Sequence, residues 1–222
     1  DLVDELAALD SGDRMVLFVI QGLSAQRFVP DVHTDPHFAL ALRSAAAAGV
    51  QVRAASVSCT PDGYVEIERL DVPVDFAPVA AVDADSGVYV AELHLEEERH
   101  LTIGSLGERT LGPGHYLYVG SAMGGLAART RRHRSRRKRL HWHVDYLRAV
   151  AGGVHIYPIY SLQRLECELA EALAVHYELP VAGFGSSDCG CKAHLFYSSR
   201  DPRRDPRFIE LLLRFRHYRA IG

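Results

Sequence analysis

Cysteines and long apolar runs are scarce in this sequence, and each scarcity excludes a class of protein. The 222 residues include four cysteines, at positions 59, 167, 189 and 191, and the last two are too close in sequence to pair easily. A disulfide framework is therefore disfavoured, and a reduced cytoplasm is expected. No apolar run approaches the roughly 20 residues of a membrane helix, and no signal peptide is apparent. We expect a cytoplasmic protein with no membrane partner.

An initial methionine is also missing. The chain begins with Asp1, and DLVDELAAL has the pattern of a helix already under way. We therefore expect the sequence to begin inside a domain. With 48% apolar residues, it is long enough for one large or two small domains with buried cores.

The net charge of −3 averages two unlike halves. Residues 1–86 hold five basic and fourteen acidic residues, whereas residues 87–222 hold twenty basic and fourteen acidic ones. Excess positive charge confined to one half indicates nucleic acid as a partner. The densest basic run, residues 129–139, contains no acid, and its self-repulsion favours an anion lying against it.

The first half has the pattern of an α/β unit. Residues 1–12 predict a helix that stops at Gly12, and the apolar run 15–21 predicts a strand buried on both faces. A helix is expected at 37–48, with Pro36 in its first turn. Residues 50–58 and 64–67 alternate like strands around a turn, and residues 70–81 are expected to form a linker.

This half resembles the carboxy-terminal end of the sugar fermentation stimulation proteins over about residues 1–77. The shared segments are VLFVIQ, the loop FVPDVHTDPHF, the strand GVQV and the closing VPV. The resemblance implies that residues 1–80 are a truncated PD-(D/E)xK-like remnant, whose nuclease motif lies upstream of Asp1. His33, Asp35 and His37 are then expected to be loop and cap groups rather than a metal site.

The second half alternates short strands and helices. Strands are expected at 87–95, 101–103, 115–121 and 156–160, with a charged turn at 96–100. Helices are expected at 126–134, 142–150, 163–176 and 208–218, and residues 180–194 form a loop rich in Gly, Ser and Cys. The whole chain is therefore predicted to be α/β.

Two tripeptides in this half carry the candidate chemistry. Gly87-Val88-Tyr89 and Tyr118-Val119-Gly120 precede a Gly turn and a helix that contains Arg129. Phosphodiester hydrolysis needs an activated water, a cation against the phosphate and a metal at the leaving oxygen. The order of these residues resembles the GIY-YIG nuclease family. The resemblance implies that residues 86–222 are a GIY-YIG-like domain, with a small, mainly antiparallel sheet flanked by helices.

The resemblance implies that Tyr89 lies at the attacking water and that Tyr118 orients the water or the first phenol. An unperturbed phenol titrates near pH 10, so it is almost wholly protonated near neutral pH. For Tyr89 to serve as a base, a nearby cation or a metal-bound water must lower the barrier to its ionisation by about 3–4 kcal/mol. Taken alone, each tyrosine is more simply a half-buried strand residue.

Arg129 lies nine residues after Gly120 and matches the family's arginine, whose planar fork can hold two phosphate oxygens. His133, one turn later, can donate to a phosphate or assist proton transfer. The alternative for both is a surface salt bridge. The residues expected to contact DNA are His133, Arg131, Arg132, Arg134, Arg136, Arg137, Lys138 and Arg139.

The family's metal ligand is a glutamate on a later helix, and LECELAEAL offers several. Excision-repair nucleases of the family carry E-A-x-x-L-E, followed nine residues later by proline. Glu171 with Pro180 matches that spacing, so Glu171 is the first choice and Glu166 the runner-up. One carboxylate with waters and phosphate oxygens would hold Mg²⁺ or Mn²⁺.

The separation of Tyr89 and Tyr118 exceeds that of most family members, and an inserted acidic hairpin at 96–107 would explain it. Together with HWHVDYL and GFGSSDCGCKAHLFY, the long separation resembles a distinct, Uri-like branch of the superfamily over about residues 86–197. The branch implies the fold and leaves the activity open.

Cys189, Cys191 and His194 form a C-x-C-x₂-H cluster that invites comparison with zinc sites. Zinc takes four ligands, and no fourth follows at a recognised spacing, although Asp188 or Cys167 could complete the set. A buried polar loop is therefore favoured over structural zinc.

The sequence thus predicts a metal-dependent endonuclease acting on DNA, with branched or flapped DNA among the candidate substrates. A non-catalytic DNA-binding protein that keeps the fold is the main alternative. Metal dependence separates the two, because binding through arginines needs no metal and falls steeply with salt. A third class is a scaffold that joins the acidic half to the basic half.

Overall fold

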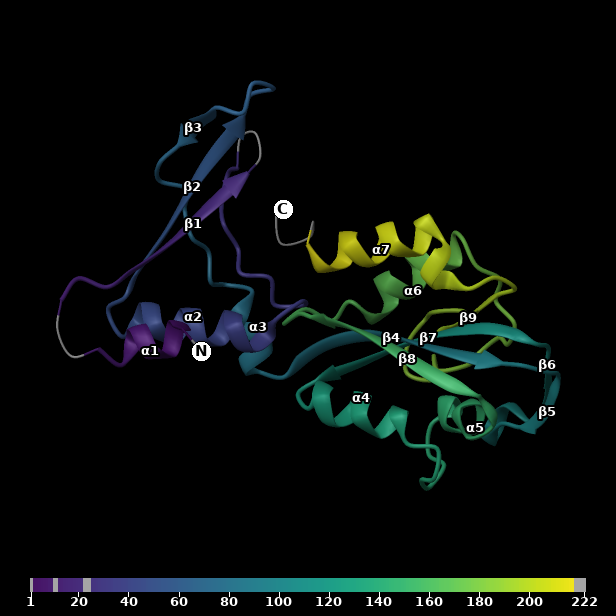
Figure 1. The fold of residues 1–222 in the computed structure, drawn as a ribbon. Helices are drawn as coiled ribbons and strands as arrows, with labels where there is room; N and C mark the ends of the chain where they lie inside the picture. Colours follow the sequence, from purple (N-terminus) through teal and green to yellow (C-terminus); the bar gives the residue numbers. More distant parts are fainter. Residues whose placement is uncertain (1, 10–11, 22–24, 218–222) are drawn as a thin grey trace. The chain divides into compact units, whose positions relative to one another are not determined.

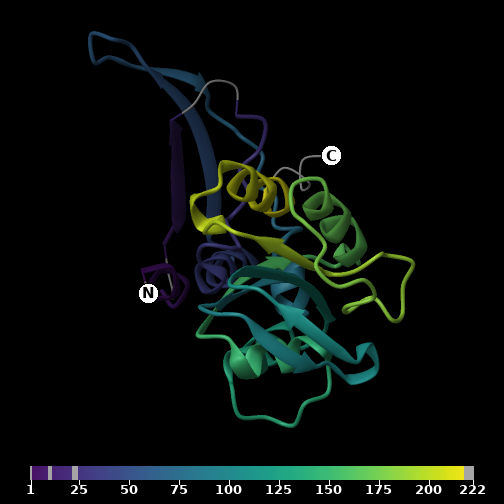
Figure 2. The same cartoon turned by 90° about the vertical axis from the view of Figure 1, so that its right-hand side faces the viewer.

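The computed structural model describes residues 2–9, 12–21 and 25–217. The chain divides into two compact units, Asp1–Asp83 and Ala84–Gly222 (Figure 1; Figure 2). No helix among the described residues is long and apolar enough to cross a membrane.

The first unit is a three-stranded sheet with helices. Strand β1 (Met15–Gln21) runs parallel to β2 (Gln51–Cys59), which pairs antiparallel with β3 (Val65–Arg69). Helix α2 (Pro36–Ala47) connects the two parallel strands, and α1 (Leu2–Ala7) and α3 (Val79–Asp83) are short. Asp35 caps α2 by accepting from the Phe38 N–H, and Pro36 occupies its first turn.

Three expectations for this unit differ from the structure. The α1 helix ends at Ala7 rather than near Gly12, and α3 begins in the last residues of the expected linker 70–81 and extends beyond it. Strand β1 is not buried on both faces, since Leu17 and Val19 are 52% and 62% exposed. Val16 and Phe18, which alternate with them, pack on the core of α1 and α2. The described part of this unit therefore leaves one apolar face of β1 uncovered.

The second unit is built on a four-stranded antiparallel sheet in the order β8-β4-β7-β9. Its strands are β4 (Ser86–Leu95), β7 (Gly114–Met123), β8 (Gly153–Tyr160) and β9 (Leu195–Ser198). A separate hairpin, β5 (Arg99–Thr102) and β6 (Glu108–Leu111) around the short helix η1 (Gly104–Leu106), follows β4. This hairpin lies between the two tyrosine tripeptides, where an acidic hairpin was expected at 96–107. The predicted α/β architecture is confirmed, although β9 was not expected.

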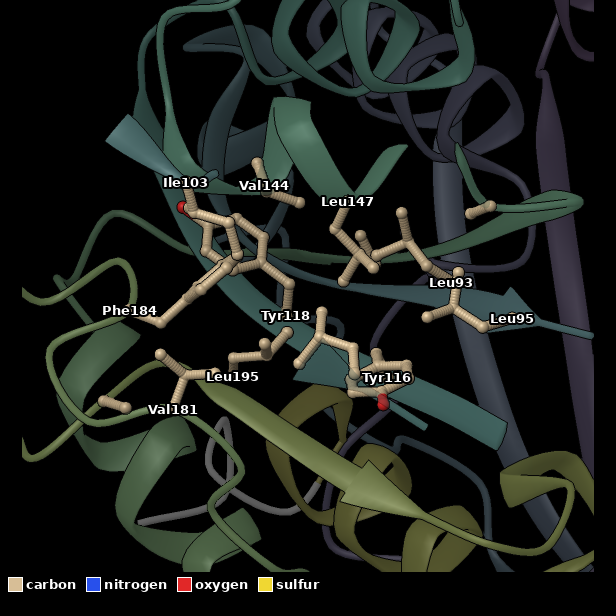
Figure 3. Close-up of a cluster of buried hydrophobic side chains, with 14 of the residues drawn as sticks. Leu93, Leu95, Ile103, Tyr116, Tyr118, Val144, Leu147, Val181, Phe184 and Leu195 are labelled. Carbon is tan, nitrogen blue, oxygen red and sulfur yellow. The ribbon is translucent and has the colours of Figure 1, made fainter. Parts of the chain in front are cut away.

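Helices cover both faces of this sheet (Figure 1). On one side lie α4 (Leu126–Arg134) and α5 (His143–Val150), and on the other α6 (Glu166–Ala174) and α7 (Pro206–Arg216), which follows the short helix η2 (Pro202–Arg204). Alternate residues of β4 pack into two hydrophobic cores, one on each face of the sheet. Leu93 packs with Val144 and Leu147 of α5, as Figure 3 shows, whereas Val88 and Val90 pack with α6 and α7. Tyr89 and Tyr118 belong to the α4/α5 core.

Candidate functional site

The two tripeptides face each other on the central strands β4 and β7, where Tyr89 is in register with Gly120. A Cβ on Gly120 would collide with the Tyr89 hydroxyl, so glycine leaves room for the ring to lie across β7. A Cβ on Gly87 would likewise collide with the Ile159 carbonyl of β8. Both motif glycines are therefore required by close approach, Gly120 to the Tyr89 ring and Gly87 to the backbone of β8.

The Tyr89 hydroxyl lies 2.8 Å from Nε2 of His133, which α4 supplies. The ring of Tyr118 lies 6.4 Å from that of Tyr89 and 6.2 Å from that of His133, measured between centroids. Tyr89, His133 and Tyr118 are 1%, 2% and 8% exposed. The three rings thus form one buried cluster, with Tyr118 nearest to solvent.

Burial controls the protonation of this cluster. It raises the pKa of Tyr89 well above 10, with help from Tyr118, and the nearby charge of Arg129 only partly opposes it. The pKa of Tyr118 is raised in the same way, by burial and by Glu166. Burial and Lys138 lower the pKa of His133 to about 4. At neutral pH both phenols keep their protons, and the neutral His133 can accept one at Nε2.

Arg129 reaches the same cluster from α4. Its guanidinium lies 4.3 Å from the centroid of the Trp142 ring, and that of Arg132 lies 4.6 Å from it. These contacts hold the arginines by cation–π attraction. The charge of Arg129 lowers the pKa values of Tyr89 and Glu166, opposing burial in both cases, so the arginine lies close to both groups.

Asp145 supplies the acid that the basic run lacks. Its carboxylate is fully buried, 2.6 Å from Arg132 Nη2 and 2.7 Å from Lys138 Nζ, and it accepts from the backbone N–H groups of His141 and Trp142. Burial opposes its ionisation, but these hydrogen bonds outweigh burial and lower the pKa of Asp145. Arg132 and Lys138 are thus engaged inside the domain. The basic side chains that stay exposed are Arg131, Arg134, Arg136, Arg137 and Arg139.

Of the two candidate metal-ligating glutamates, the structure brings Glu166 to the cluster. Glu166 accepts a hydrogen bond from the Ser121 hydroxyl of β7 and lies 3.1 Å from Nδ1 of His194. Burial raises its pKa, but these two bonds outweigh burial and lower it. Glu171 is exposed. A helix turns about 100° per residue, so a residue five positions later faces elsewhere.

Glu166 has the chemistry that Mg²⁺ or Mn²⁺ requires. Its carboxylate is ionised, its side chain is 26% exposed, and its hard oxygens suit these ions. Ser121, Trp142 and Asp145 were not expected at this site, although the segment HWHVDYL contains the last two. Only the folded sheet and the α4–α5 turn bring them to the cluster.

A comparison with curated proteins and one with solved structures each find no match. The family model of the sugar fermentation stimulation protein RE domain matches residues 3–63. A second model, described as domain of unknown function DUF123, matches residues 88–216, more than half of the chain. The second match spans the sheet except the first two residues of β4, and it includes Tyr89, the tripeptide at 118–120 and the loop before β9. The chain therefore belongs to the DUF123 family, the GIY-YIG-like, Uri-type family that its motifs indicate.

Proposed function

We propose that the second unit is a metal-dependent endonuclease that hydrolyses phosphodiester bonds in DNA. Its tyrosine centre consists of Tyr89, Tyr118, Arg129, His133 and Glu166. The observation that carries the proposal is the 2.8 Å contact between the Tyr89 hydroxyl and a buried, neutral His133. This contact gives a phenol of raised pKa an acceptor for its proton.

The proton path follows from these two groups. A water that attacks phosphorus transfers a proton to the Tyr89 oxygen while Tyr89 passes its own proton to His133 Nε2. The phenolate need not form as a separate species, which its raised pKa disfavours. The new oxygen–phosphorus bond forms as the bond to the leaving oxygen breaks, and that oxygen takes a proton from solvent. Tyr118, the more exposed phenol, orients the water.

Two groups are proposed to stabilise the negative charge of the phosphate. Arg129, held on the Trp142 ring, donates to the non-bridging oxygens. Glu166 would hold Mg²⁺ or Mn²⁺, which would supply positive charge to stabilise the phosphate and the leaving oxygen. Ser121 and His194 orient the Glu166 carboxylate.

DNA binding is assigned to the five exposed arginines of the segment 131–139. They carry positive charge that Asp145 does not neutralise, and arginine contacts to phosphates require no particular base sequence. His133 is buried and bonded to Tyr89, so it acts on the proton rather than on the DNA backbone.

A cleavage assay with a matched pair of variants tests the proposal. Labelled duplex, single-stranded and branched DNA are incubated with the full chain and Mg²⁺, Mn²⁺ or EDTA, beside Glu166→Ala and Glu171→Ala. We expect metal-dependent cutting that Glu166→Ala lowers by about 100-fold or more. Glu171→Ala, on the same helix but exposed, keeps it. Equal loss of cutting in both variants would contradict the assignment of the metal to Glu166. No cutting by the wild type would overturn the proposal.

A second candidate function is DNA binding without cleavage. The burial of the Tyr89 hydroxyl favours it, because the residue is 1% exposed and an attacking water must enter beside Tyr118. This function predicts binding that EDTA leaves unchanged, with no cutting of any DNA. Tyr89 and His133 would then be a hydrogen-bonded pair of the core.

A further inference from the structure

A thiol and imidazole cluster lies beside the tyrosine centre. Cys167 lies in the first turn of α6. Cys189 and Cys191 lie in the loop that precedes β9, and His194 is the residue immediately before that strand. One ligand atom from each lies within 4.8 Å of all the others. The fourth ligand that local spacing does not supply is therefore present, and another element contributes it.

The geometry and the ligand types suit one metal. A tetrahedral zinc ion, with bonds of about 2.3 Å to sulfur and 2.0 Å to nitrogen, places a sulfur and a nitrogen about 3.5 Å apart. Sγ of Cys189 lies 3.5 Å from Nε2 of His194. Three soft thiolates and an imidazole favour zinc over Mg²⁺ or Ca²⁺, which prefer oxygen ligands. We propose that Cys167, Cys189, Cys191 and His194 bind a structural zinc ion.

The loop that carries two of these cysteines gives the ion a structural task. Residues 181–194 form no helix or strand, and backbone bonds such as Gly183 N–H to the Lys192 carbonyl hold them. The loop nevertheless covers the tyrosine centre: the Phe184 ring lies 6.1 Å from that of Tyr118, and a Cβ on Gly185 would approach Tyr118 within 2.8 Å. Zinc would fasten this loop to α6.

His194 links the zinc site to Glu166. When Nε2 binds the metal, Nδ1 must carry the proton and donate it to Glu166, whose Oε1 lies 3.1 Å away. A carboxylate in this position commonly fixes the tautomer and the orientation of a metal-bound histidine. The same bond would hold Glu166 in the tyrosine centre. This link rests on the proposed function, whereas the zinc site itself does not.

Metal content is the direct test. The full chain is purified under reducing conditions without chelators, and zinc is measured by mass spectrometry. We expect about one zinc per chain, and less than about 0.1 in Cys167→Ser and Cys191→Ser. Cys59→Ser, an exposed thiol in the other unit, retains the metal. Cys167→His, which keeps a zinc ligand, restores binding and guards against a variant that only fails to fold. Replacement by Co²⁺ should give the visible absorption of a thiolate-bound tetrahedral ion.

Two results would overturn the zinc site. One is a wild-type chain that holds no zinc and takes none up although its four thiols titrate as free. The other is a disulfide between two of the three clustered cysteines in the freshly purified chain. Cleavage assays run in parallel separate this proposal from the nuclease proposal. A wild-type chain that holds zinc but does not cut contradicts only the nuclease, and one that cuts fully but neither holds nor takes up zinc contradicts only the zinc site.

Discussion

At the scale of single residues, close packing explains the tyrosine tripeptides better than ionisation does. Tyr89 lies across β7 because Gly120 has no side chain there. If Tyr89 acts as a base, a nearby cation or a metal-bound water was expected to lower the cost of ionising its phenol. Burial instead raises the pKa of Tyr89, since Arg129 compensates only in part. In the proposed mechanism the phenol therefore needs an acceptor for its proton, and the hydrogen bond to His133 offers one.

Gly120→Ala should therefore disturb the cluster. Its Cβ would collide with the Tyr89 hydroxyl in a buried core, and overpacking of this kind costs about 1–3 kcal/mol. Unfolding in urea measures the loss. Gly112→Ala is the matched control, because nothing lies within 4 Å of its added Cβ. Equal stability of the two variants would contradict the packing described for Tyr89.

His133 should make stability depend on pH. Its pKa is about 4 in the folded chain and 6.5 when free, so the unfolded state binds more protons between these values. The stability contributed by neutral His133 is thus present above pH 6.5 and is lost as pH falls towards 4, by up to about 3 kcal/mol. Lys138, Arg129 and Arg132 oppose protonation, and Asp145 favours it.

Unfolding free energies measured at pH 7, 5.5 and 4.5 check this expectation. The decline towards low pH should be smaller in His133→Gln than in the wild type. His176→Gln, at an exposed position, should keep the wild-type decline. Parallel pH profiles for all three proteins would show that His133 is not the buried, neutral group described.

At the scale of elements, regular patterns were readable from the sequence and distant pairings were not. The apolar run of β1 and the helix α4 were predicted with the bounds that the structure has. Strand β9 was missed because its four residues form a strand only by pairing with β7. Spacing to Pro180 favoured Glu171, whereas α6 begins at Glu166 and directs that residue towards Ser121.

Asp145 illustrates what an element contributes beyond its own sequence. It lies on α5 but anchors Arg132 and Lys138 of the basic segment. Asp145→Asn should lower the free energy of unfolding by about 3–5 kcal/mol, because it leaves partly buried cations without their counter-charge. Urea unfolding measures this, with the exposed Glu171→Gln as control. A loss as small as that of the control would contradict the anchoring role.

At the scale of the whole molecule, the basic second unit should bind DNA through phosphate contacts. Three of the exposed arginines lie together in the segment after α4: Arg136, Arg137 and Arg139. Replacing all three with alanine should reduce the slope of log affinity against log salt by about 2–3, since each phosphate contact contributes about 0.9. Fluorescence anisotropy at several salt concentrations measures the slope. Arg69→Ala, a control at an exposed position of the first unit, should leave the slope unchanged. An unaltered slope in the triple variant would show that these three arginines do not contact the DNA.

The role of the tyrosine hydroxyls can be tested by the single-turnover rate of DNA cleavage in three tyrosine variants. Each replacement by phenylalanine keeps the buried ring and removes one hydroxyl. We expect Tyr89→Phe and Tyr118→Phe to slow cleavage by about 10²–10⁴-fold. Tyr116→Phe, whose hydroxyl bonds the Gly112 carbonyl away from His133, should cleave at the wild-type rate. Equal rates in all three variants, or no cleavage by the wild type, would contradict a nuclease built on these tyrosines.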